Sequence, residues 1–406
     1  MYPDLLKGVR VVDFTTHVAA PACTRIMADW GADVIKVEGT GGEAYRVFGA
    51  SLGTPIDDDK NPLFQLENAN KRDIGLNLKT PEGMEAMLKL IGTADVFITN
   101  VRMKSLEKLG LDYETLSAKF PKLVWGHVSG YGLYGEEAAR PGFDIVAFWA
   151  RGGMMCDMPP KGNPPLSVPS GVGDHTTALA LLGGVCAALL KARQTGRGEK
   201  ICTSLYNTAI YASGLMVTSS QYGDHYPKSR YEPSTPLMNS YCSKDGEWFT
   251  LALLNYEVMF PKLCKVLELD DGLASDPRYC NVTAVKQNGN NEALCRILEE
   301  GFAKFDSAYL GEEMTKHDLT FERCRHFHEI SKDPQAHANF YFNEFEYADG
   351  STVQLPATPV HFSTNEALPC GPAPKLGEHN VEVLGELGYT PEQVAAMEKS
   401  GAAVSR

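Results

Sequence analysis

The sequence predicts an α/β fold built on a parallel sheet, and three segments indicate it. Residues 9–38 and 74–99 each carry a strand pattern, a helical pattern and a second strand pattern, in that order. A strand pattern at 123–128 precedes a long apolar helical pattern at 178–190 and a further strand pattern at 200–205. Strands that alternate with helices in this way favour parallel pairing through right-handed crossovers.

The first strand–helix–strand unit would open a dinucleotide-binding domain if it carried the glycine fingerprint of such domains. The strand at 9–14 instead runs into Thr15-Thr-His-Val-Ala-Ala-Pro21, which has no G-x-G-x-x-G pattern. The helix at 20–30 tolerates Pro21 in its first turn, and Gly31 ends it before the strand at 34–38. The missing glycines argue against binding of NAD at this turn.

Positive charge concentrates around the second unit, against an acidic background. A strand at 74–78, a helix from Thr80-Pro81 to about Gly92 and a strand at 94–99 are predicted there. Residues 100–104 follow the last of these strands, where open α/β sheets bind ligands. The basic residues are Lys71, Arg72, Lys79, Arg102, Lys104 and Lys108. Two interpretations stay open, a solvated surface and a binding site for phosphates.

One acidic residue, Asp174, stands between a loop rich in Gly and Pro at 152–173 and the long apolar helix. Aspartate is a favoured N-cap, where its side chain accepts hydrogen bonds from the first free N–H groups of the helix. The same groups and the helix dipole hold a carboxylate ionised, so it is also able to act as a nucleophile on an activated acyl group. Local spacing leaves both roles open. Asp144, after Arg140-Pro-Gly-Phe143, is a second predicted N-cap.

Composition limits the class of protein. The chain has 406 residues, 43% of them hydrophobic and 22% charged, which suits a globular protein of two or three domains. A net charge of −13 argues against nucleic-acid binding. The longest apolar run, 178–190, is short for a bilayer, and the N-terminus lacks the apolar segment of a signal peptide. Ten scattered cysteines without a Cys-x-x-Cys pair indicate reduced, mostly buried thiols in a cytoplasmic protein.

The second half of the chain has a different pattern. Residues 219–240 are polar, contain three prolines and predict a linker. A strand at 248–254 and a mainly helical stretch at 257–330 follow, and a strand pattern returns at 353–362.

A group of potential metal ligands lies in the helical stretch, at His317, Cys324, His326 and His328. Their spacing matches no known ligand set on one face of a helix. We therefore predict no metal site.

Ten short stretches of the chain have a common interpretation. They are 8–14, 31–38, 68–72, 78–83, 95–100, 130–132, 141–144, 173–174, 195–198 and 376–379. Together, in this order, they resemble the class III CoA-transferases, the family of formyl-CoA, carnitine-CoA and phenyllactate-CoA transferases. Each stretch is short, but the ordered set is specific.

This resemblance implies a fold and an assembly. It implies a Rossmann-like large domain formed by both ends of the chain, a smaller α+β domain, and two subunits threaded through each other as an interlocked homodimer. The large domain is then expected at 1–218 and the linker at 219–240. The small domain is expected at 241–335, with a return linker and the C-terminal part of the large domain at 336–406.

The resemblance also implies a role for Asp174, because the catalytic aspartate of the family matches this position. In such enzymes the carboxylate attacks an acyl-CoA thioester and forms a mixed anhydride. The CoA thiolate then attacks the aspartyl carbonyl, which gives an aspartyl-CoA thioester and frees the first acid. The acceptor acid repeats these steps in reverse, so no ATP is needed. Coenzyme A is thus a substrate, and no prosthetic group is expected.

The resemblance implies contacts with CoA as well. The matching positions are Val18, Ala19, Leu76, Lys79, Asn100, Val101, Arg102 and Lys108. The basic side chains among them are expected to meet the phosphates, and the aliphatic ones to flank the adenine.

Within the family, stretches such as 66–71, 99–102, 141–153 and 236–241 are most similar to the branch that acts on 2-hydroxy acids from amino-acid fermentation. The resemblance implies a branched or aromatic 2-hydroxy acid, such as phenyllactate or 2-hydroxyisocaproate, as the acceptor. Candidates for an apolar acyl pocket are Phe148, Trp149, Met154 and Met155, and each is equally compatible with an ordinary core position.

Two alternative functions remain. The family contains α-methylacyl-CoA racemases, which use the histidine of a Gly-His-Asp segment to transfer a proton. Here that segment is Gly142-Phe143-Asp144, and phenylalanine cannot transfer a proton. The other alternative is a non-catalytic protein that binds CoA.

Overall fold

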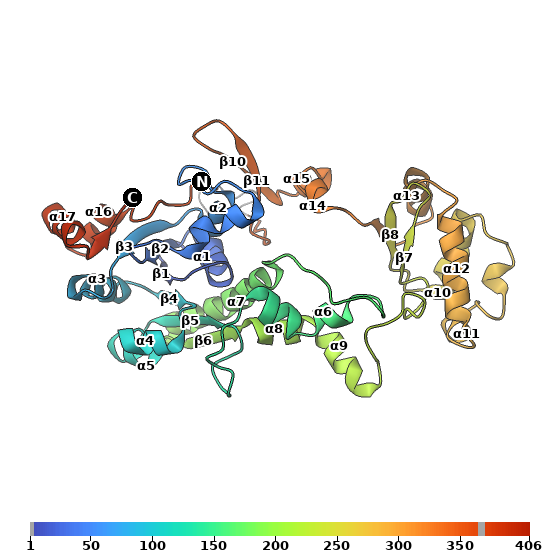
Figure 1. Cartoon of the computed structure of the whole chain (residues 1–406), viewed down its shortest axis with the longest axis horizontal. Helices are drawn as coiled ribbons and strands as arrows, with labels where there is room; N and C mark the ends of the chain where they lie inside the picture. The colour runs from blue at the N-terminus through green and yellow to red at the C-terminus, as the bar shows by residue number, and fades with distance from the viewer. Residues whose placement is uncertain (1–3, 364–369) are drawn as a thin grey trace. The chain divides into compact units, whose positions relative to one another are not determined.

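The structure, a computed structural model, describes residues 4–363 and 370–406 and has the predicted α/β fold (Figure 1). Seven strands form a central sheet in the order β12-β3-β2-β1-β4-β5-β6. The parallel strands are β1 (Arg10–Phe14), β2 (Asp33–Glu38), β3 (Arg72–Leu76), β4 (Val96–Thr99), β5 (Val124–Ser129) and β6 (Lys200–Ser204). Strand β12 (Ala403–Val404) pairs antiparallel with β3.

The predicted strands of this sheet agree with the structure except at β3, which lies at Arg72–Leu76 and not at 74–78. The chain turns at Asn77, whose carbonyl oxygen accepts a hydrogen bond from the Thr80 N–H at 3.0 Å. Thr80 then caps α3 (Pro81–Gly92), as predicted from Thr80-Pro81. The alternation of Ile74, Leu76 and Leu78 therefore continued beyond the strand into the turn.

Helices cover both faces of the sheet. On one face, α1 (Ala19–Asp29) and α7 (Val172–Thr195) pack against residues such as Val11 and Ile98. On the other face, residues such as Val12 contact helices that come from two distant parts of the chain. These helices are α3, α4 (Met103–Leu109), α5 (Tyr113–Lys119), α16 (Asn380–Glu386) and α17 (Pro391–Ser400). Successive strand residues point to opposite faces, which is why Val11 and Val12 belong to different cores.

The order of the parallel strands is that of a doubly wound sheet, with the direction of winding reversed between β1 and β4. The loops after these two strands lie at the same edge. Asn100, directly after β4, joins them: its amide accepts from the Thr16 N–H at 3.0 Å and donates to the Thr16 carbonyl at 2.7 Å. Sheets of this type bind ligands at such a reversal, outside the carboxyl ends of the strands.

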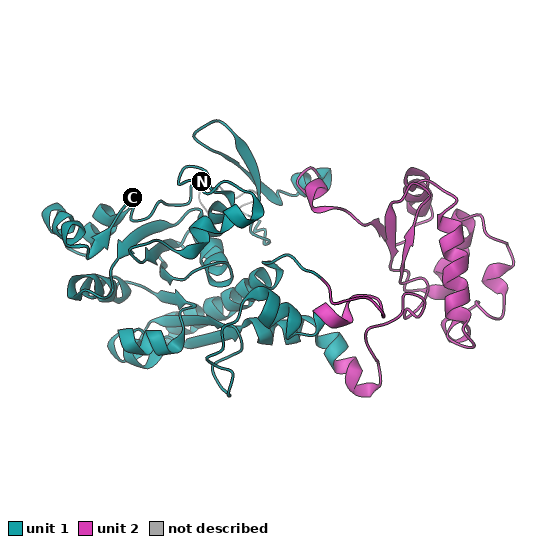
Figure 2. Ribbon diagram, in the orientation of Figure 1, with its two compact units in different colours: residues 1–154, 167–217, 333–406 teal, residues 155–166, 218–332 magenta. Residues whose placement is uncertain are grey.

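The chain forms two compact units (Figure 2). Unit 1 comprises residues 1–154, 167–217 and 333–406 and contains the seven-stranded sheet. It also contains a hairpin of β10 and β11. The predicted return to strand at 353–362 overlaps β11, whereas β10 was not predicted. The further elements of unit 1 are η1 (Ala44–Leu52), α2 (Pro62–Asn68), η2 (Asp144–Ala150), α8 (Leu205–Ala212), α15 (Pro334–Ala338), β10 (Phe342–Glu346) and β11 (Thr352–Pro356).

Unit 2 comprises residues 155–166 and 218–332. Its three-stranded sheet and helices enclose a separate core that includes Tyr241, Phe249 and Phe302. Its elements are β7 (Ser240–Cys242), β8 (Trp248–Leu251), α10 (Tyr256–Val266), η4 (Leu273–Ser275), α11 (Val282–Val285), α12 (Asn290–Phe302), α13 (Ser307–Lys316), β9 (Phe321–Arg323) and α14 (Phe327–Ile330). Helix α6 (Met154–Asp157) and the segment of α9 (Gly214–Ser219) and η3 (Ser220–Tyr222) lie where the two units join along the chain.

The C-terminal segment is fixed to β3 by the stretch 376–379. The Gly377 N–H donates to Asp73 Oδ1 at 2.6 Å, and the His379 N–H donates to the Asp73 carbonyl at 2.9 Å. Burial and the neighbouring Glu38 carboxylate raise the pKa of Asp73 well above its ordinary value, while the Gly377 N–H and the charge of Arg46 oppose the shift. The stretch 376–379 therefore has a structural role in unit 1.

Helix α7 is longer than the apolar run at 178–190 suggested. Among the described residues it is the one helix long and apolar enough, by length and composition, to cross a membrane, and 39% of its most apolar part is buried in the chain. Core helices of soluble proteins meet the same criterion.

The ten cysteines are all unpaired, but only Cys23, Cys264 and Cys295 are buried, so the expectation of mostly buried thiols was wrong.

Candidate active site

Asp174 lies in the first turn of α7, at the carboxyl edge of the sheet. This position follows from topology, because α7 leads into the parallel strand β6 and so begins at the edge where β5 ends. Gly171 is the N-cap of the helix, with a φ of 107° that favours glycine. The N-cap prediction for Asp174 is therefore wrong. The Asp174 side chain is partly buried and makes no hydrogen bond with any residue of 4–363 or 370–406.

Asp144 caps α7 in place of Asp174. Its Oδ2 accepts a hydrogen bond from the Gly171 N–H at 2.8 Å, across 27 residues of sequence. Asp144 was predicted to cap the helix that follows it, but Phe143 is the N-cap of η2 and Asp144 is the first residue inside. Gly173 makes this approach possible, because a Cβ at residue 173 would overlap Asp144 Oδ1 and the Phe148 ring. The Asp144 carboxylate thus lies against the backbone that presents Asp174.

The surroundings of Asp174 disfavour its negative charge. Burial, followed by the charges of Asp144 and Glu67, raises its pKa to about 7, while His175 acts in the opposite direction. The pKa of Asp144 is also raised by burial, although the backbone N–H groups of α7 oppose the shift. A carboxylate with a pKa near neutrality, and without a structural hydrogen bond, fits a catalytic role better than a capping role.

A histidine–carboxylate pair lies next to Asp174. His175 Nε2 is 2.9 Å from Oε1 of Glu67, which is on α2 and is 1% exposed. Burial by itself would lower the pKa of His175, but Glu67, Asp174 and Asp144 outweigh it and raise the pKa. The surrounding carboxylates therefore favour the protonated, positively charged form of His175.

Aromatic side chains form a second group near the start of α7. The His17 ring packs edge-on against Phe143 at a centroid distance of 5.3 Å and against Tyr45 at 6.4 Å. Burial raises the pKa of Tyr45, and the charges of Glu67 and Asp174 add to the shift. Phe143 is 61% exposed beside the capping Asp144. None of these aromatic residues was predicted from the sequence as part of the site.

His17 has an unusual backbone, with a φ of 64°. Its N–H donates to Glu43 Oε2 at 2.8 Å, which stabilises the left-handed conformation. A histidine with positive φ is uncommon and marks a position worth testing for function. No sequence pattern indicates such a conformation.

Two of the residues suggested for an acyl pocket are core residues. Phe148 and Met154 are buried together with Ala147, Leu205 and Ala209. Trp149 packs against this cluster from its partly buried position, and Met155 belongs to unit 2. For Phe148 and Met154 the structure therefore supports the core interpretation.

Most of the residues suggested for CoA binding end or follow a strand of the sheet. Val18 and Ala19 start α1 after β1, while Asn100, Val101 and Arg102 follow β4. Leu76 ends β3, Lys79 follows it, and Lys108 is in α4. The side chains of Val18, Ala19 and Leu76 are buried, and Asn100 is bonded to Thr16. The topology thus brings the residues that end or directly follow a strand to the carboxyl side of the sheet, whereas Lys108 lies in the last turn of α4. Several of these side chains are not free.

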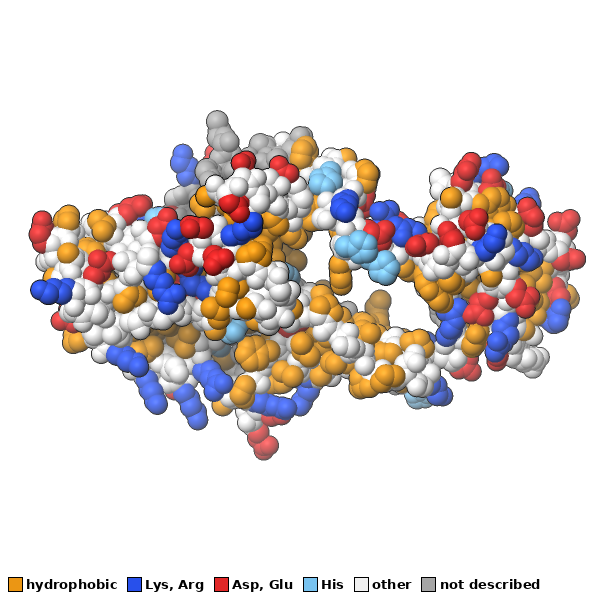
Figure 3. All heavy atoms as spheres, turned by 45° about the horizontal axis from the view of Figure 1, so that its top comes forward, with side chains coloured by type: hydrophobic (Ala, Val, Ile, Leu, Met, Phe, Trp, Pro, Cys, Tyr) orange, Lys and Arg blue, Asp and Glu red, His pale blue; other side chains and the backbone are white. Residues whose placement is uncertain are grey.

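The basic cluster divides into two groups. Lys71 is fully buried in an ion pair with Asp13 at 2.9 Å, and Arg72 pairs with Asp33, Glu382 and Glu386. These two cations have structural partners. The other four are exposed and have no ion pair with a residue of the described ranges: Lys79, Arg102, Lys104 and Lys108. Figure 3 shows Lys and Arg side chains gathered along the lower edge of unit 1 in that view.

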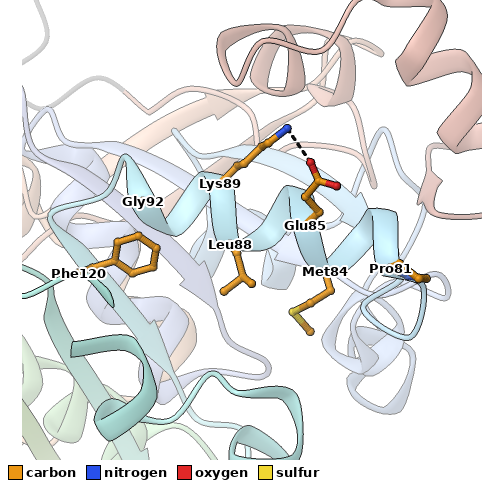
Figure 4. Close-up of a pocket in the computed structure, with 7 residues that line it drawn as sticks. All are labelled: Pro81, Met84, Glu85, Leu88, Lys89, Gly92 and Phe120. Atoms are coloured by element: carbon orange, nitrogen blue, oxygen red, sulfur yellow. Dashed lines mark ion pairs between the residues drawn. The ribbon is translucent and has the colours of Figure 1, made fainter. Parts of the chain in front are cut away.

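Asp174 lines neither of two surface hollows in unit 1. One, of about 580 Å³, lies on the outer face of α3 and is lined by Met84, Leu88 and Phe120, with a Lys89–Glu85 ion pair at 2.8 Å beside it (Figure 4). A second, of about 430 Å³, lies beside β5 and β6 and includes Tyr134 and Cys202. Over the described part of the chain, no group of three His, Cys, Asp or Glu side chains is placed to hold a metal ion.

The strand order, the reversal between β1 and β4 and the helix start carrying Asp174 define a doubly wound α/β enzyme. The profile of CoA-transferase family III matches residues 6–380, and the chain belongs to this family. It is accordingly a CoA-transferase, and acyl-CoA is its substrate.

Relatives of known activity match over nearly the whole chain. The chain is 41% identical to (R)-2-hydroxy-4-methylpentanoate CoA-transferase of Clostridioides difficile over 96% of its length and 97% of that protein. It is 36% identical to cinnamoyl-CoA:phenyllactate CoA-transferase of Clostridium sporogenes, over 98% of this chain and 96% of that protein. A crystal structure of a CAIB/BAIF family protein from Brucella suis superposes with a TM-score of 0.80 at 28% identity, over 94% of this chain and 99% of that one.

Proposed function

We propose that this enzyme transfers CoA from an acyl-CoA to a branched or aromatic 2-hydroxy acid, with Asp174 as the covalent nucleophile. The main support for the proposal is that the Asp174 carboxylate is not used as a helix cap. It stands at the start of α7 without a hydrogen bond to a described residue, while Asp144 performs the capping role. A carboxylate that the fold does not use for capping is available to react.

The reaction then proceeds through two kinds of covalent intermediate on Asp174, a mixed anhydride and an aspartyl-CoA thioester. An Asp174 oxygen attacks the thioester carbonyl, the C–S bond breaks, and a mixed anhydride and CoA thiolate form. The thiolate attacks the aspartyl carbonyl, the anhydride C–O bond breaks, and the donor acid leaves as a carboxylate. The acceptor carboxylate attacks the aspartyl-CoA thioester, and the released thiolate attacks the new acyl group to regenerate Asp174. Splitting one exchange into several steps lowers each barrier.

We propose that CoA lies across the reversal between β1 and β4. The contacts are those suggested above, from Val18, Ala19, Leu76, Lys79, Asn100, Val101, Arg102 and Lys108. The exposed cations Lys79, Arg102 and Lys108 suit the phosphates, because they have no competing carboxylate among the described residues. Of the buried aliphatic residues, Val18 and Ala19 shape the floor of the site, while Leu76 acts through the packing of β3.

The substrate class follows from the two curated relatives, whose names contain 2-hydroxy-4-methylpentanoate and phenyllactate. Both are 2-hydroxy acids with an apolar side chain. The exposed Phe143, next to His17 and near Asp174, provides an apolar surface for such a side chain. We infer that this surface, and not the buried Phe148 and Met154, contacts the acyl group.

Mass spectrometry of acyl exchange tests the proposed substrate. The purified protein is incubated with a panel of acyl-CoA donors and with branched, aromatic and unbranched 2-hydroxy acids. We expect new CoA esters of the branched and aromatic 2-hydroxy acids, formed at least about tenfold faster than esters of lactate, because the larger side chains bury more apolar surface. If CoA esters form from other acids but not from the branched and aromatic 2-hydroxy acids, the proposal is contradicted. Incorporation of deuterium from heavy water at Cα without acyl exchange would favour racemisation instead.

We also propose the interlocked homodimer, in the cytoplasm and without a nucleic-acid or membrane partner. Helix α7 is apolar around its whole circumference, and its outer face in unit 1 leaves Leu179 and Leu190 exposed. On and after α8, Ile210, Tyr211 and Leu215 are exposed as well. An apolar face of this kind is expected to be covered by another protein surface.

Sedimentation of the full chain at nanomolar concentration tests the assembly. We expect a dimer of about twice 44.4 kDa that does not dissociate on dilution, since threaded subunits separate only by unfolding. A monomer that retains full activity at these concentrations would rule the dimer out.

A further inference from the structure

The pair formed by His175 and Glu67 has no part in the covalent steps, yet it lies beside the nucleophile. The two side chains are joined at 2.9 Å between Nε2 and Oε1. The Glu67 side chain is 2% exposed and the His175 side chain 48% exposed. A buried carboxylate is costly unless it is paired, and its hydrogen bond holds one nitrogen of the imidazole in place. The pair therefore fixes the ring while leaving much of it accessible.

Protonation of His175 runs against its position in the helix. A cation in the first turn is disfavoured by the helix dipole. Here the carboxylates of Glu67 on α2, of Asp174 on α7 and of Asp144 at the start of η2 face the imidazole and favour its protonated form. When protonated, the ring donates from both nitrogens. Nδ1 makes no hydrogen bond within the described ranges, so one donor is available to a ligand.

A 2-hydroxy acid needs such a donor at this place. Its hydroxyl is attached to the carbon next to the carbonyl that Asp174 must reach, and His175 is the next residue in the same helical turn. The described groups whose charges act on Asp174 are Asp144, Glu67 and His175, and among them only His175 can carry a positive charge. The two carboxylates already have hydrogen-bond partners: Asp144 accepts from the Gly171 N–H, and Glu67 is paired with His175.

We propose that His175, held by Glu67, donates a hydrogen bond from Nδ1 to the 2-hydroxyl of the acyl group bound at Asp174, and so selects 2-hydroxy acids. This inference rests on the proposed function. It assigns a substrate contact to His175 and a positioning role to Glu67.

Isotope exchange between an acid and its own CoA ester tests the contact, because this reaction involves one acyl group at a time. The full-length enzyme is given ¹³C-labelled (R)-2-hydroxy-4-methylpentanoate with its unlabelled CoA ester, or labelled 4-methylpentanoate with its CoA ester. Mass spectrometry follows the label into the ester. The readout is the discrimination, defined as kcat/KM for the hydroxy pair divided by kcat/KM for the pair without the hydroxyl.

Three variants separate the hydrogen bond from the charge. His175→Phe is expected to lower the discrimination about ten- to a hundredfold, the effect of losing one hydrogen bond to a buried polar group. His175→Gln keeps an N–H donor without the charge, so the discrimination is expected to stay within about threefold of the wild-type value. Its pH–rate profile should shift to higher pH, since the cation that opposes the raised pKa of Asp174 is gone. The control His361→Phe, which removes an exposed histidine of unit 1, should change neither readout.

The possible results are distinguishable. A wild-type discrimination near one, or an unchanged discrimination in His175→Phe, overturns the inference while leaving CoA transfer intact. Loss of exchange in the wild type with every acid overturns the proposed function instead. If His175→Phe does not fold, Glu67→Gln provides the same test: the ring loses its charged partner, and the discrimination is expected to fall about three- to tenfold. No fall in that variant also contradicts the inference.

Discussion

Replacement of Asp174 by alanine is expected to lower kcat for CoA transfer by about a thousandfold or more, because the covalent intermediates can no longer form. Acyl-CoA binding should persist, since the proposed CoA contacts lie after β1, β3 and β4 and do not include this carboxylate. Steady-state kinetics and equilibrium binding of an acyl-CoA measure the two quantities separately. Hydroxylamine added during turnover is expected to trap a modified Asp174 in the wild-type protein and nothing at this position in the variant.

The Asp174 side chain is also expected to lower the free energy of unfolding, by an amount that depends on pH. Burial raises the pKa of Asp174 from 3.8 to about 7, so the folded state resists ionisation more than the unfolded state. Well below pH 3.8 the group is neutral in both states and the cost is absent. The cost grows as the pH rises through 3.8 toward 7 and is complete above 7. Asp174→Asn is thus expected to be about 1–3 kcal/mol more stable than the wild type at pH 8, and to differ from it by less than about 1 kcal/mol at pH 4.

A matched control distinguishes the role of Asp174 from that of any acid in a first helical turn. Glu392 occupies the first turn of α17 and is exposed, and Glu392→Ala should keep full activity. Denaturant unfolding at pH 4 and pH 8 gives the stability of each variant. An Asp174→Ala protein that folds and keeps more than about a tenth of the wild-type kcat would remove this residue from the covalent mechanism.

Substitution of Gly173 by alanine is the second change for which we expect a large effect. The new Cβ would overlap Asp144 Oδ1 and the Phe148 ring, and both neighbours are buried. The start of α7 must then move away from Asp144, and the hydrogen bond to the Gly171 N–H is lost or stretched. We expect a loss of about 2–4 kcal/mol in the free energy of unfolding and at least about a hundredfold in kcat, because Asp174 shifts with the helix start.

Gly385→Ala is the matched control for this change. Gly385 is also within a helix, α16, but a Cβ there meets no atom within 4 Å, so alanine should stabilise the protein by about 0.5–1 kcal/mol. The comparison is made by measuring thermal unfolding and kcat for both Gly173→Ala and Gly385→Ala. Equal stability of the two variants, with full activity, would mean that the contact between Asp144 and the α7 backbone is unimportant.

The strands of the sheet were predictable because each strand is marked by the residues of its own short segment. The strands at 10–14, 33–38, 96–99 and 124–129 are short apolar runs between turn residues, and each agrees with its pattern to within about two residues. The capping of α7 was not predictable in this way. Both Asp144 and Asp174 are good N-cap residues by type, and only the fold decides that Asp144 reaches across 27 residues to Gly171.

Burial of charge was also beyond the reach of sequence patterns. Lys71 and Arg72 looked like part of a phosphate site, but Lys71 is buried against Asp13, and that partner is 58 residues away. The position of His17 beside Phe143 depends on a left-handed backbone that any sequence pattern would assign to glycine or asparagine first. Long-range partners and unusual dihedral angles are decided by the whole fold.

The family resemblance succeeded for a physical reason. Several of the matching stretches mark places where two backbones touch, as at Gly130 and Gly142, where a Cβ on either would come within 2.7 Å of the other backbone. Gly377 similarly lies against the backbone of Val404, whose carbonyl oxygen a Cβ at residue 377 would overlap. Such positions tolerate few residue types, so they identify the fold, whereas the exposed Phe143 and His175 are free to differ with the substrate.

The pairing of β12 with β3 has a consequence for biosynthesis. Gly75 and Leu76 pair with Val404 and Ala403, so one edge of the sheet is completed by residues more than 300 positions later. Until the ribosome has released that segment, the backbone of β3 presents unpaired N–H and C=O groups along this edge, which is a template for pairing with other chains. The nascent protein is therefore expected to depend on chaperones until residues 403 and 404 have emerged from the ribosome.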